Sequence, residues 1–259
     1  MSTILFNEIV FGPVHSRRMG SSLGINLLPY DGKICSFDCI YCECGFNKNF
    51  RTKTKLPERE NVKAALKEKL TLLKKEGTVL DVITFAGNGE PTMHPEFNEI
   101  IEDTLELRNQ YYPQTEISVL SNGMHLKNPG VFEALKKIEK PVLKLDSAFD
   151  ETVRLIDRPN STDYSVAKQV DLYKRFKGNF ILQTMFLKGE FEGKYIDNTT
   201  EEEISAWLEL LRALNPREVM IYTIDRETPV EGLEKASYET LQNIASRVEE
   251  LGIRTNVAG

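Results

Sequence analysis

The chain has 259 residues and carries 33 Lys and Arg against 39 Asp and Glu, a formal net charge of −6. Hydrophobic residues make up 41% and charged residues 28%, which excludes a disordered tail and a collagen-like chain. No apolar run approaches the ~20 residues that a bilayer span requires, which excludes a membrane protein. The first residues carry neither a basic segment nor a long apolar core, so we expect no secretory signal and a cytoplasmic protein.

Strand-like and helix-like patterns alternate along the chain. In chain order, the predicted pairs of strand and following helix are 23–28 with 58–75, 79–86 with 95–110, 116–120 with 129–138, 142–146 with 163–176, 179–185 with 201–214, and 218–223 with 238–251. Near-continuous apolar strands are typical of a parallel sheet buried on both faces. Six such units in succession predict an α/β fold, either a doubly wound sheet or a whole or partial barrel. No linker-like or low-complexity segment interrupts them, so we expect one domain over residues 1–259. Its core would cover roughly residues 20–225, with an N-terminal extension and a C-terminal helix and strand.

Glycine and polar residues collect where the predicted strands end. They are Gly87, Gly89, Glu90 and Pro91 after the second strand, Ser121 and Asn122 after the third, Asp146 at the end of the fourth, and Thr223 at the end of the sixth. Active sites of α/β barrels lie at this edge. Turn and cap residues are of the same types, so each position alone is weak evidence.

All four cysteines fall within ten residues, at Cys35, Cys39, Cys42 and Cys44, after the first predicted strand. In a protein expected to be cytoplasmic, such a cluster indicates metal binding or catalysis. Thiolates select iron–sulfur clusters or zinc. Structural zinc sites usually join ligand pairs from separate turns, so a single loop favours the cluster and leaves zinc as the alternative.

The cysteine spacing resembles the signature of the radical S-adenosylmethionine (SAM) superfamily. Three residues separate Cys35 from Cys39, two separate Cys39 from Cys42, and the aromatic Tyr41 precedes the last cysteine. The segment 88–91 after the next strand resembles the Gly-Gly-Glu-Pro motif of that superfamily, with Asn88 in place of the first glycine.

The resemblance covers roughly residues 20–225 and implies a partial (β/α)6 barrel of the TIM type. Residues 13–25 are similar, more narrowly, to the tRNA wyosine-synthase-related branch, although no second cysteine set for another cluster is present. This implies a [4Fe-4S] cluster on Cys35, Cys39 and Cys42, SAM at the fourth iron, and a reductant such as flavodoxin or ferredoxin.

The resemblance also implies a binding site for SAM. Glu90 would accept hydrogen bonds from its amino group, and Gly87 and Gly89 would let the backbone come close, with Pro91 completing the motif. Tyr41 would border the adenine. The remaining implied contacts are Ser121, Asn122 or Asp146 to the ribose and Thr223 at the adenine.

Structural interpretations stand beside these roles. Glu90 would serve as the charge at a helix N-terminus, Asn122 as a turn residue, Asp146 as a cap and Tyr41 as ordinary packing. Cys44 would be a bystander, a substrate-side thiol or an alternative ligand. The cluster of His15, Arg17 and Arg18 would bind an anion or form structural ion pairs.

Three functions remain open. The first is a radical SAM enzyme of unassigned substrate, with a nucleoside or tRNA base favoured by the branch resemblance and disfavoured by the acidic charge. The second is an activase that abstracts hydrogen from a glycine of a partner enzyme. The third is a non-enzymatic iron–sulfur or zinc protein that uses all four thiols.

Overall fold

The computed structural model describes residues 4–259, which divide into two compact units. The N-terminal unit comprises residues 5–35 and 47–141, and the C-terminal unit comprises residue 4, residues 36–46 and residues 142–259. Among residues 4–259, no helix is both long and apolar enough to cross a membrane.

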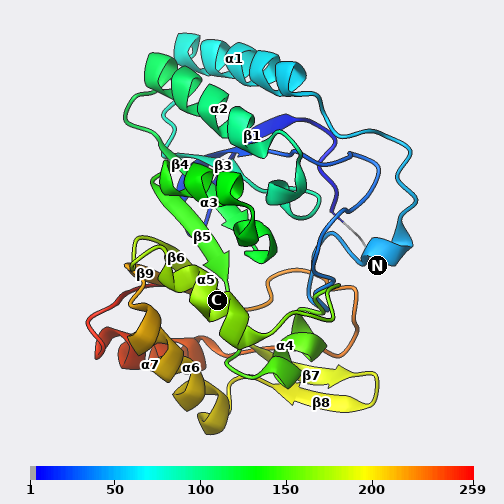
Figure 1. Ribbon diagram of the computed structural model, residues 1–259, viewed down its shortest axis with the longest axis vertical. Helices are drawn as coiled ribbons and strands as arrows, with labels where there is room; N and C mark the ends of the chain where they lie inside the picture. The colour runs from blue at the N-terminus through cyan, green and yellow to red at the C-terminus, as the bar shows by residue number, and fades with distance from the viewer. Residues whose placement is uncertain (1–3) are drawn as a thin grey trace. The chain divides into compact units, whose positions relative to one another are not determined.

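The N-terminal unit is a sheet covered by helices. Its strands lie in the order β1 (Val10–Ser16), β2 (Gly20–Ile25), β3 (Val82–Phe85) and β4 (Glu116–Ser121). β1 pairs antiparallel with β2, and the β2–β3 and β3–β4 pairs are parallel. The helices are α1 (Arg59–Lys75), α2 (Phe97–Tyr111) and α3 (Pro129–Lys136), with short 3-10 helices at Asn47–Asn49, Pro91–Met93 and Met124–Lys127. In Figure 1, α1 and α2 lie side by side.

Strand β1 lies outside the predicted elements. It carries Pro13 and a bulge between Phe11 and Val14, features tolerated on an edge strand because Pro donates no ladder hydrogen bond. Its turn into β2 contains Arg17 and Arg18, and the side-chain oxygen of Ser16 accepts from the backbone N–H groups of Arg18 and Met19.

This turn lies at the amino end of β2. Because β2, β3 and β4 are parallel, Glu90 and Ser121 follow at the opposite, carboxyl edge of the same sheet. The structure therefore places His15, Arg17 and Arg18 away from the edge where the motif residues gather.

The C-terminal unit repeats the parallel arrangement. β5 (Lys140–Lys144) begins in the N-terminal unit, and its last three residues open the order β5, β6 (Ile181–Met185), β9 (Glu218–Tyr222) and β11 (Arg254–Ala258), all parallel. Its helices are α4 (Asp150–Ile156), α5 (Val166–Lys174), α6 (Glu201–Leu214) and α7 (Tyr238–Glu249). Thr200 caps α6 by accepting from the backbone N–H of Glu203, and Trp207 lies on its buried face.

A second, three-stranded sheet follows β6 in the order β10 (Glu234–Lys235), β7 (Leu187–Phe191) and β8 (Lys194–Asp197). β7 and β8 form the antiparallel hairpin visible at the lower right of Figure 1. Glu192 and Gly193, with φ of 53° and 74°, make its turn. Two successive residues of positive φ match the twist of a tight hairpin.

Candidate functional site

The cysteine loop begins as a short β-bridge in the N-terminal unit. Ile34 pairs in parallel with Gly89: its N–H donates to the Asn88 carbonyl at 3.0 Å, and the Glu90 N–H donates to the Ile34 carbonyl at 3.1 Å. Gly89 has φ of 133°, and a Cβ there would lie 1.9 Å from the Ile34 oxygen. Glycine is therefore required, and the bridge fixes Cys35, the next residue, beside the turn that carries Glu90.

Two asparagines hold Cys35 in place. The Cys35 N–H donates to Asn47 Oδ1 and its carbonyl accepts from Asn47 Nδ2, both at 3.1 Å. Asn122 Nδ2 donates to Cys35 Sγ at 3.6 Å. The first cysteine is thus oriented by contacts to its backbone and to its sulfur.

Glu90 is the centre of a buried polar network. Its Oε1 accepts from Thr92 Oγ1 at 2.5 Å and from Ser121 Oγ at 2.8 Å, and its Oε2 accepts from the Asn122 N–H at 2.7 Å. It also caps the short helix that begins at Pro91, through the Thr92 N–H at 3.2 Å. The structure brings Glu90, Ser121 and Asn122 together as expected, and the capping interpretation of Glu90 holds as well.

Asn88 and Gly87 have partners within the protein. The Asn88 side chain accepts from the Phe6 N–H and donates to the carbonyls of Phe6 and Pro29, each at 2.8 Å. A Cβ on Gly87 would lie 2.4 Å from Asn26 Oδ1. Both positions thus serve close packing of the chain against itself.

The rest of the cysteine loop belongs to the C-terminal unit. The Cys42 N–H donates to the Cys39 carbonyl at 3.2 Å, and the Ile40 N–H donates to the Ile156 carbonyl at 2.9 Å. Cys39 is buried and its Sγ lies 3.3 Å from Asp157 Oδ1. Beyond the cysteines, the Arg158 guanidinium lies 5.2 Å from the centre of the Phe46 ring and 4.9 Å from that of Phe191, which connects the loop to β7.

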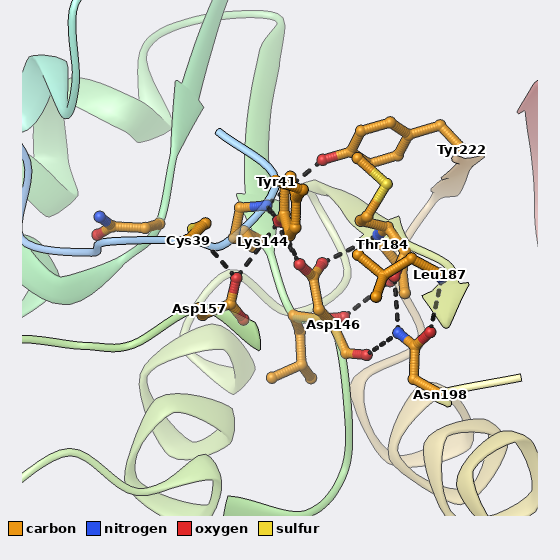
Figure 2. A network of polar contacts seen from close by, with 12 residues as sticks. Cys39, Tyr41, Lys144, Asp146, Asp157, Thr184, Leu187, Asn198 and Tyr222 are labelled. Carbon is orange, nitrogen blue, oxygen red and sulfur yellow. Dashed lines mark hydrogen bonds and ion pairs between the residues drawn. The ribbon is translucent and has the colours of Figure 1, made fainter. Parts of the chain in front are cut away.

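Tyr41 joins a buried network of charged groups (Figure 2). Its hydroxyl donates to Asp146 Oδ2 and accepts from the Lys144 ammonium, which lies 4.7 Å above the Tyr41 ring. Lys144 Nζ also contacts Asp146 Oδ2 at 3.3 Å and Tyr222 at 3.4 Å. Asp157 Oδ1 lies 3.3 Å from the Tyr41 hydroxyl.

Burial and opposite charge set the ionisation of this network. Burial, reinforced by the Asp146 carboxylate, raises the pKa of Tyr41 well above its usual value. Burial alone would lower the pKa of Lys144, but the neighbouring groups, Asp146 first among them, together outweigh it and the net pKa is well above normal. Burial and then Asp146 raise the pKa of Asp157 well above normal. At neutral pH Tyr41 is therefore a neutral phenol beside a permanent ammonium ion.

Asp146 and Thr223 lie just beyond the carboxyl ends of β5 and β9. Asp146 Oδ1 accepts from the Met185 N–H at 3.0 Å, and its carbonyl accepts from Asn198 Nδ2 at 2.8 Å. It caps no helix, since α4 begins at Asp150. The Thr223 hydroxyl donates to the Phe186 carbonyl at 2.7 Å and accepts from the Ala236 N–H at 2.9 Å. Both side chains are buried among their partners.

The donor set fits an iron–sulfur cluster. Cys35, Cys39, Cys42 and Cys44 are all free of disulfides, with Cys35 and Cys42 half-buried. Among residues 4–259, no three His, Cys, Asp or Glu side chains are grouped closely enough to hold one metal ion. Each cysteine of a cubane binds a different iron, so the sulfurs need not converge on one point.

Lys144, Asp157 and Asn47 are the residues that sequence reasoning missed. Lys144 had a signal: it stands two positions before Asp146 in an apolar strand, and alternate residues share a face. No sequence pattern marks Asp157 or Asn47, because only the folding of the cysteine loop brings them to Cys39 and Cys35.

The comparisons with known proteins agree with the motifs. The model of the radical SAM superfamily matches residues 30–199. The UPF0026 protein MJ1312 of Methanocaldococcus jannaschii is 31% identical over 252 residues, which cover 94% of this chain and 72% of that protein. A protein named GTPase Obg from Brachyspira hyodysenteriae is 30% identical over 237 residues, covering 90% of this chain and only 32% of its own length.

Solved structures share the fold at low identity. A radical SAM methyltransferase from Sphaerobacter thermophilus has a TM-score of 0.64 at 15% identity, covering 92% of this chain and 65% of that one. TYW1 with a lysine-pyruvate adduct has a TM-score of 0.58 at 17% identity, and the match covers 88% of this chain and 73% of that one. These likenesses confirm the expected α/β fold, a partial barrel of the radical SAM type. By its motifs, its fold and the family match, the chain belongs to the radical SAM superfamily of enzymes.

Proposed function

We propose that this chain reductively cleaves SAM at a [4Fe-4S] cluster held by Cys35, Cys39 and Cys42. The observation that carries the proposal is the cysteine spacing on the loop after β2, in a chain of this superfamily. When bound, the cluster and SAM supply a 5′-deoxyadenosyl radical that abstracts hydrogen from a substrate. The protein's part is to hold, orient and shield these groups.

Glu90 is suited to bind the amino group of SAM. A carboxylate oxygen has two acceptor positions, and Glu90 Oε2 accepts a hydrogen bond from the Asn122 N–H. The bonds from Thr92 and Ser121 fix the carboxylate, so a charge-assisted hydrogen bond from an ammonium costs little reorganisation. Gly87, Gly89 and Pro91 supply the turn that presents it.

Asp146, Tyr41 and Thr223 are proposed on the ribose and adenine side. Asp146 Oδ1 accepts the Met185 N–H and retains an acceptor position for a ribose hydroxyl, which makes it a better partner than Ser121. The hydroxyl of Thr223 is hydrogen-bonded to Phe186 and Ala236, so we propose that this side chain contacts adenine by van der Waals packing and not by a hydrogen bond. Neutral Tyr41 presents a ring fixed by Lys144 and Asp146.

We further propose a cytoplasmic, single-domain enzyme that receives electrons from a reductant such as flavodoxin or ferredoxin. A nucleoside or tRNA base is the favoured substrate class, supported by the resemblance of residues 13–25 to the wyosine-synthase-related branch. The activase of a glycyl-radical enzyme is the second candidate, supported by the same cysteine spacing; isolation of a much larger bound partner enzyme would favour it.

The test is anaerobic reconstitution followed by reduction with SAM and quantitation of 5′-deoxyadenosine. We expect four irons per chain and a change in the electron paramagnetic resonance spectrum when SAM binds. The variant C39A should lose the cluster and the product. The matched control C44A, at a buried thiol outside the motif, should keep both.

A loss of the centre in C44A as large as in C39A would overturn the proposal. It would instead favour the non-enzymatic protein that binds iron–sulfur or zinc with all four thiols. Zinc retained after reconstitution with iron and sulfide would lead to the same conclusion.

A further inference from the structure

The side-chain amide of Asn122 has a defined orientation. Its Oδ1 accepts from the Met124 N–H at 3.1 Å, so Nδ2 is the atom that faces Cys35 Sγ at 3.6 Å. Asn122 is 5% exposed, and its own N–H donates to Glu90. The turn, the carboxylate and the sulfur together fix one rotamer.

This geometry differs from that of an ordinary turn asparagine. A turn requires only that the side-chain oxygen at this position accept from the Met124 N–H, which serine or aspartate also allows. The amide N–H aimed at the sulfur is an additional feature that only asparagine supplies here. Cys35 is in turn held against it by the two bonds from Asn47 and by the bridge at Ile34.

We propose that Asn122 sets the reduction potential of the cluster by donating an N–H hydrogen bond to the sulfur of Cys35. The proposal rests on the proposed function, since it requires Cys35 to be a cluster ligand. Asn122 is thus a positioning residue that acts through Cys35, in place of the ribose contact expected from the sequence.

The physical basis is the charge on the cysteine sulfur. A ligand sulfur becomes more negative when its cluster gains an electron, so a hydrogen-bond donor stabilises the reduced state more than the oxidised state. The Asn122 side chain is buried, so water competes little for its N–H. Removing the donor makes reduction harder and lowers the midpoint potential.

The experiment compares N122S with the wild type after anaerobic loading. Serine keeps a hydroxyl that accepts from the Met124 N–H but does not reach Cys35. Iron content and the visible spectrum are measured first, and the midpoint potential is then titrated under electron paramagnetic resonance. We expect full loading and roughly a tenfold shift of the equilibrium toward the oxidised state, about 59 mV lower for one electron.

Two further variants separate this role from a structural one. N122D keeps the size and the turn acceptor but loses the N–H, so we expect a drop in potential at least as large, which tests the proposal even if N122S folds poorly. S121A loosens the same turn by removing its bonds to Glu90 and Gly123 without touching Cys35. Its potential should match the wild type.

The outcomes distinguish the two proposals. A wild-type chain that takes up no cluster contradicts the proposed function itself. Loaded variants N122S and N122D with the wild-type potential overturn the role of Asn122 and leave the proposed function standing. Equal shifts in S121A and N122S also overturn it, because loosening of the turn would then account for the effect.

Discussion

Asn88 shows how one residue takes over a structural role where the superfamily motif has glycine. Its amide is completely buried and bonds to Phe6 and Pro29, far apart in sequence. The Asn88 N–H also donates to Asn26 Oδ1 at 3.1 Å. This side chain therefore ties the N-terminal segment to the turn that carries Glu90.

We expect N88G, which restores the motif glycine, to lower the free energy of unfolding by roughly 2–4 kcal/mol. The variant leaves the N–H of Phe6 and the carbonyl of Pro29 without their partner, at about 1–3 kcal/mol for each unsatisfied group, partly relieved by water. The carbonyl of Phe6 keeps a hydrogen bond from Asn26 Nδ2 at 3.4 Å. Urea denaturation measures the change. The control N128G, at the exposed N-cap of α3, should cost only a few tenths of a kcal/mol; equal costs in the two variants would contradict the prediction.

At the same scale, the sequence revealed the motif residues but not their partners. Cys35 and Glu90 could be singled out because their types and spacing are unusual. The bond from Asn122 to Cys35 joins residues 87 positions apart, and no periodicity encodes such a contact. The same holds for Asp157 beside Cys39.

At the scale of elements, α1 and α2 are joined by a buried carboxylate. Asp103 on α2 accepts from Arg59 Nε at 2.7 Å and from Lys63 Nζ at 2.8 Å, both on α1. The hydrogen bond from Arg59, aided by Lys63, lowers the pKa of Asp103 against the opposing effect of burial. Asp103 thus helps to hold these helices over the sheet that carries the Glu90 turn.

The lowered pKa predicts a pH-dependent contribution of Asp103 to stability. A carboxyl group whose pKa is depressed on folding stabilises the protein above its unfolded value, 3.8 for Asp, and loses that effect as the pH falls through the lowered value. We expect D103N to unfold at lower urea than the wild type at pH 7 and the two midpoints to converge below pH 3.8. The control D171N, at an exposed pair with Lys174, should change little. A gap for D103N that persists unchanged in acid would contradict this assignment.

The elements that the sequence predicts well are those with a long, regular pattern of apolar residues that the fold buries. Helix α6, 201–214, matches its predicted range because its cap and its apolar face agree. The first predicted strand, 23–28, is shifted: β2 spans Gly20–Ile25, because β1 pairs with Gly20 and the chain turns at Asn26, whose Oδ1 accepts from the Leu28 N–H. Leu27 and Leu28 are buried without being strand, so burial was mistaken for extended structure.

The missed elements share weak local signals. The seven-residue α4 is too short for a clear period. The segment 188–197, which lies between the predicted strand 179–185 and the predicted helix 201–214, forms most of the β7–β8 hairpin. Its Glu192-Gly193 pair between alternating residues was the available sign of a tight turn.

At the scale of the whole molecule, family and substrate are separate questions. The chain spans about a third of the Brachyspira protein and 72% of the Methanocaldococcus protein, so the relatives contain further sequence that this chain does not match. The Sphaerobacter methyltransferase and TYW1 share the fold at 15% and 17% identity. The same scaffold serves many reactions, and so the substrate must be sought in the residues of the site and by experiment.

The cluster should also stabilise the protein as a whole. A group that binds the folded chain but not the unfolded one adds free energy that grows with its affinity, about 2.7 kcal/mol at a hundredfold excess over the dissociation constant. For a chain of this size, we expect the loaded protein to melt roughly 5–10 °C above the same protein stripped of iron under anaerobic conditions. Calorimetry of both forms measures the difference, which should vanish in C42A because that variant lacks one of the three ligands. Equal melting temperatures for loaded and stripped wild-type protein would mean that the cysteine loop holds the cluster without coupling it to folding, contrary to the buried position of Cys39 and the many contacts that fix Cys35.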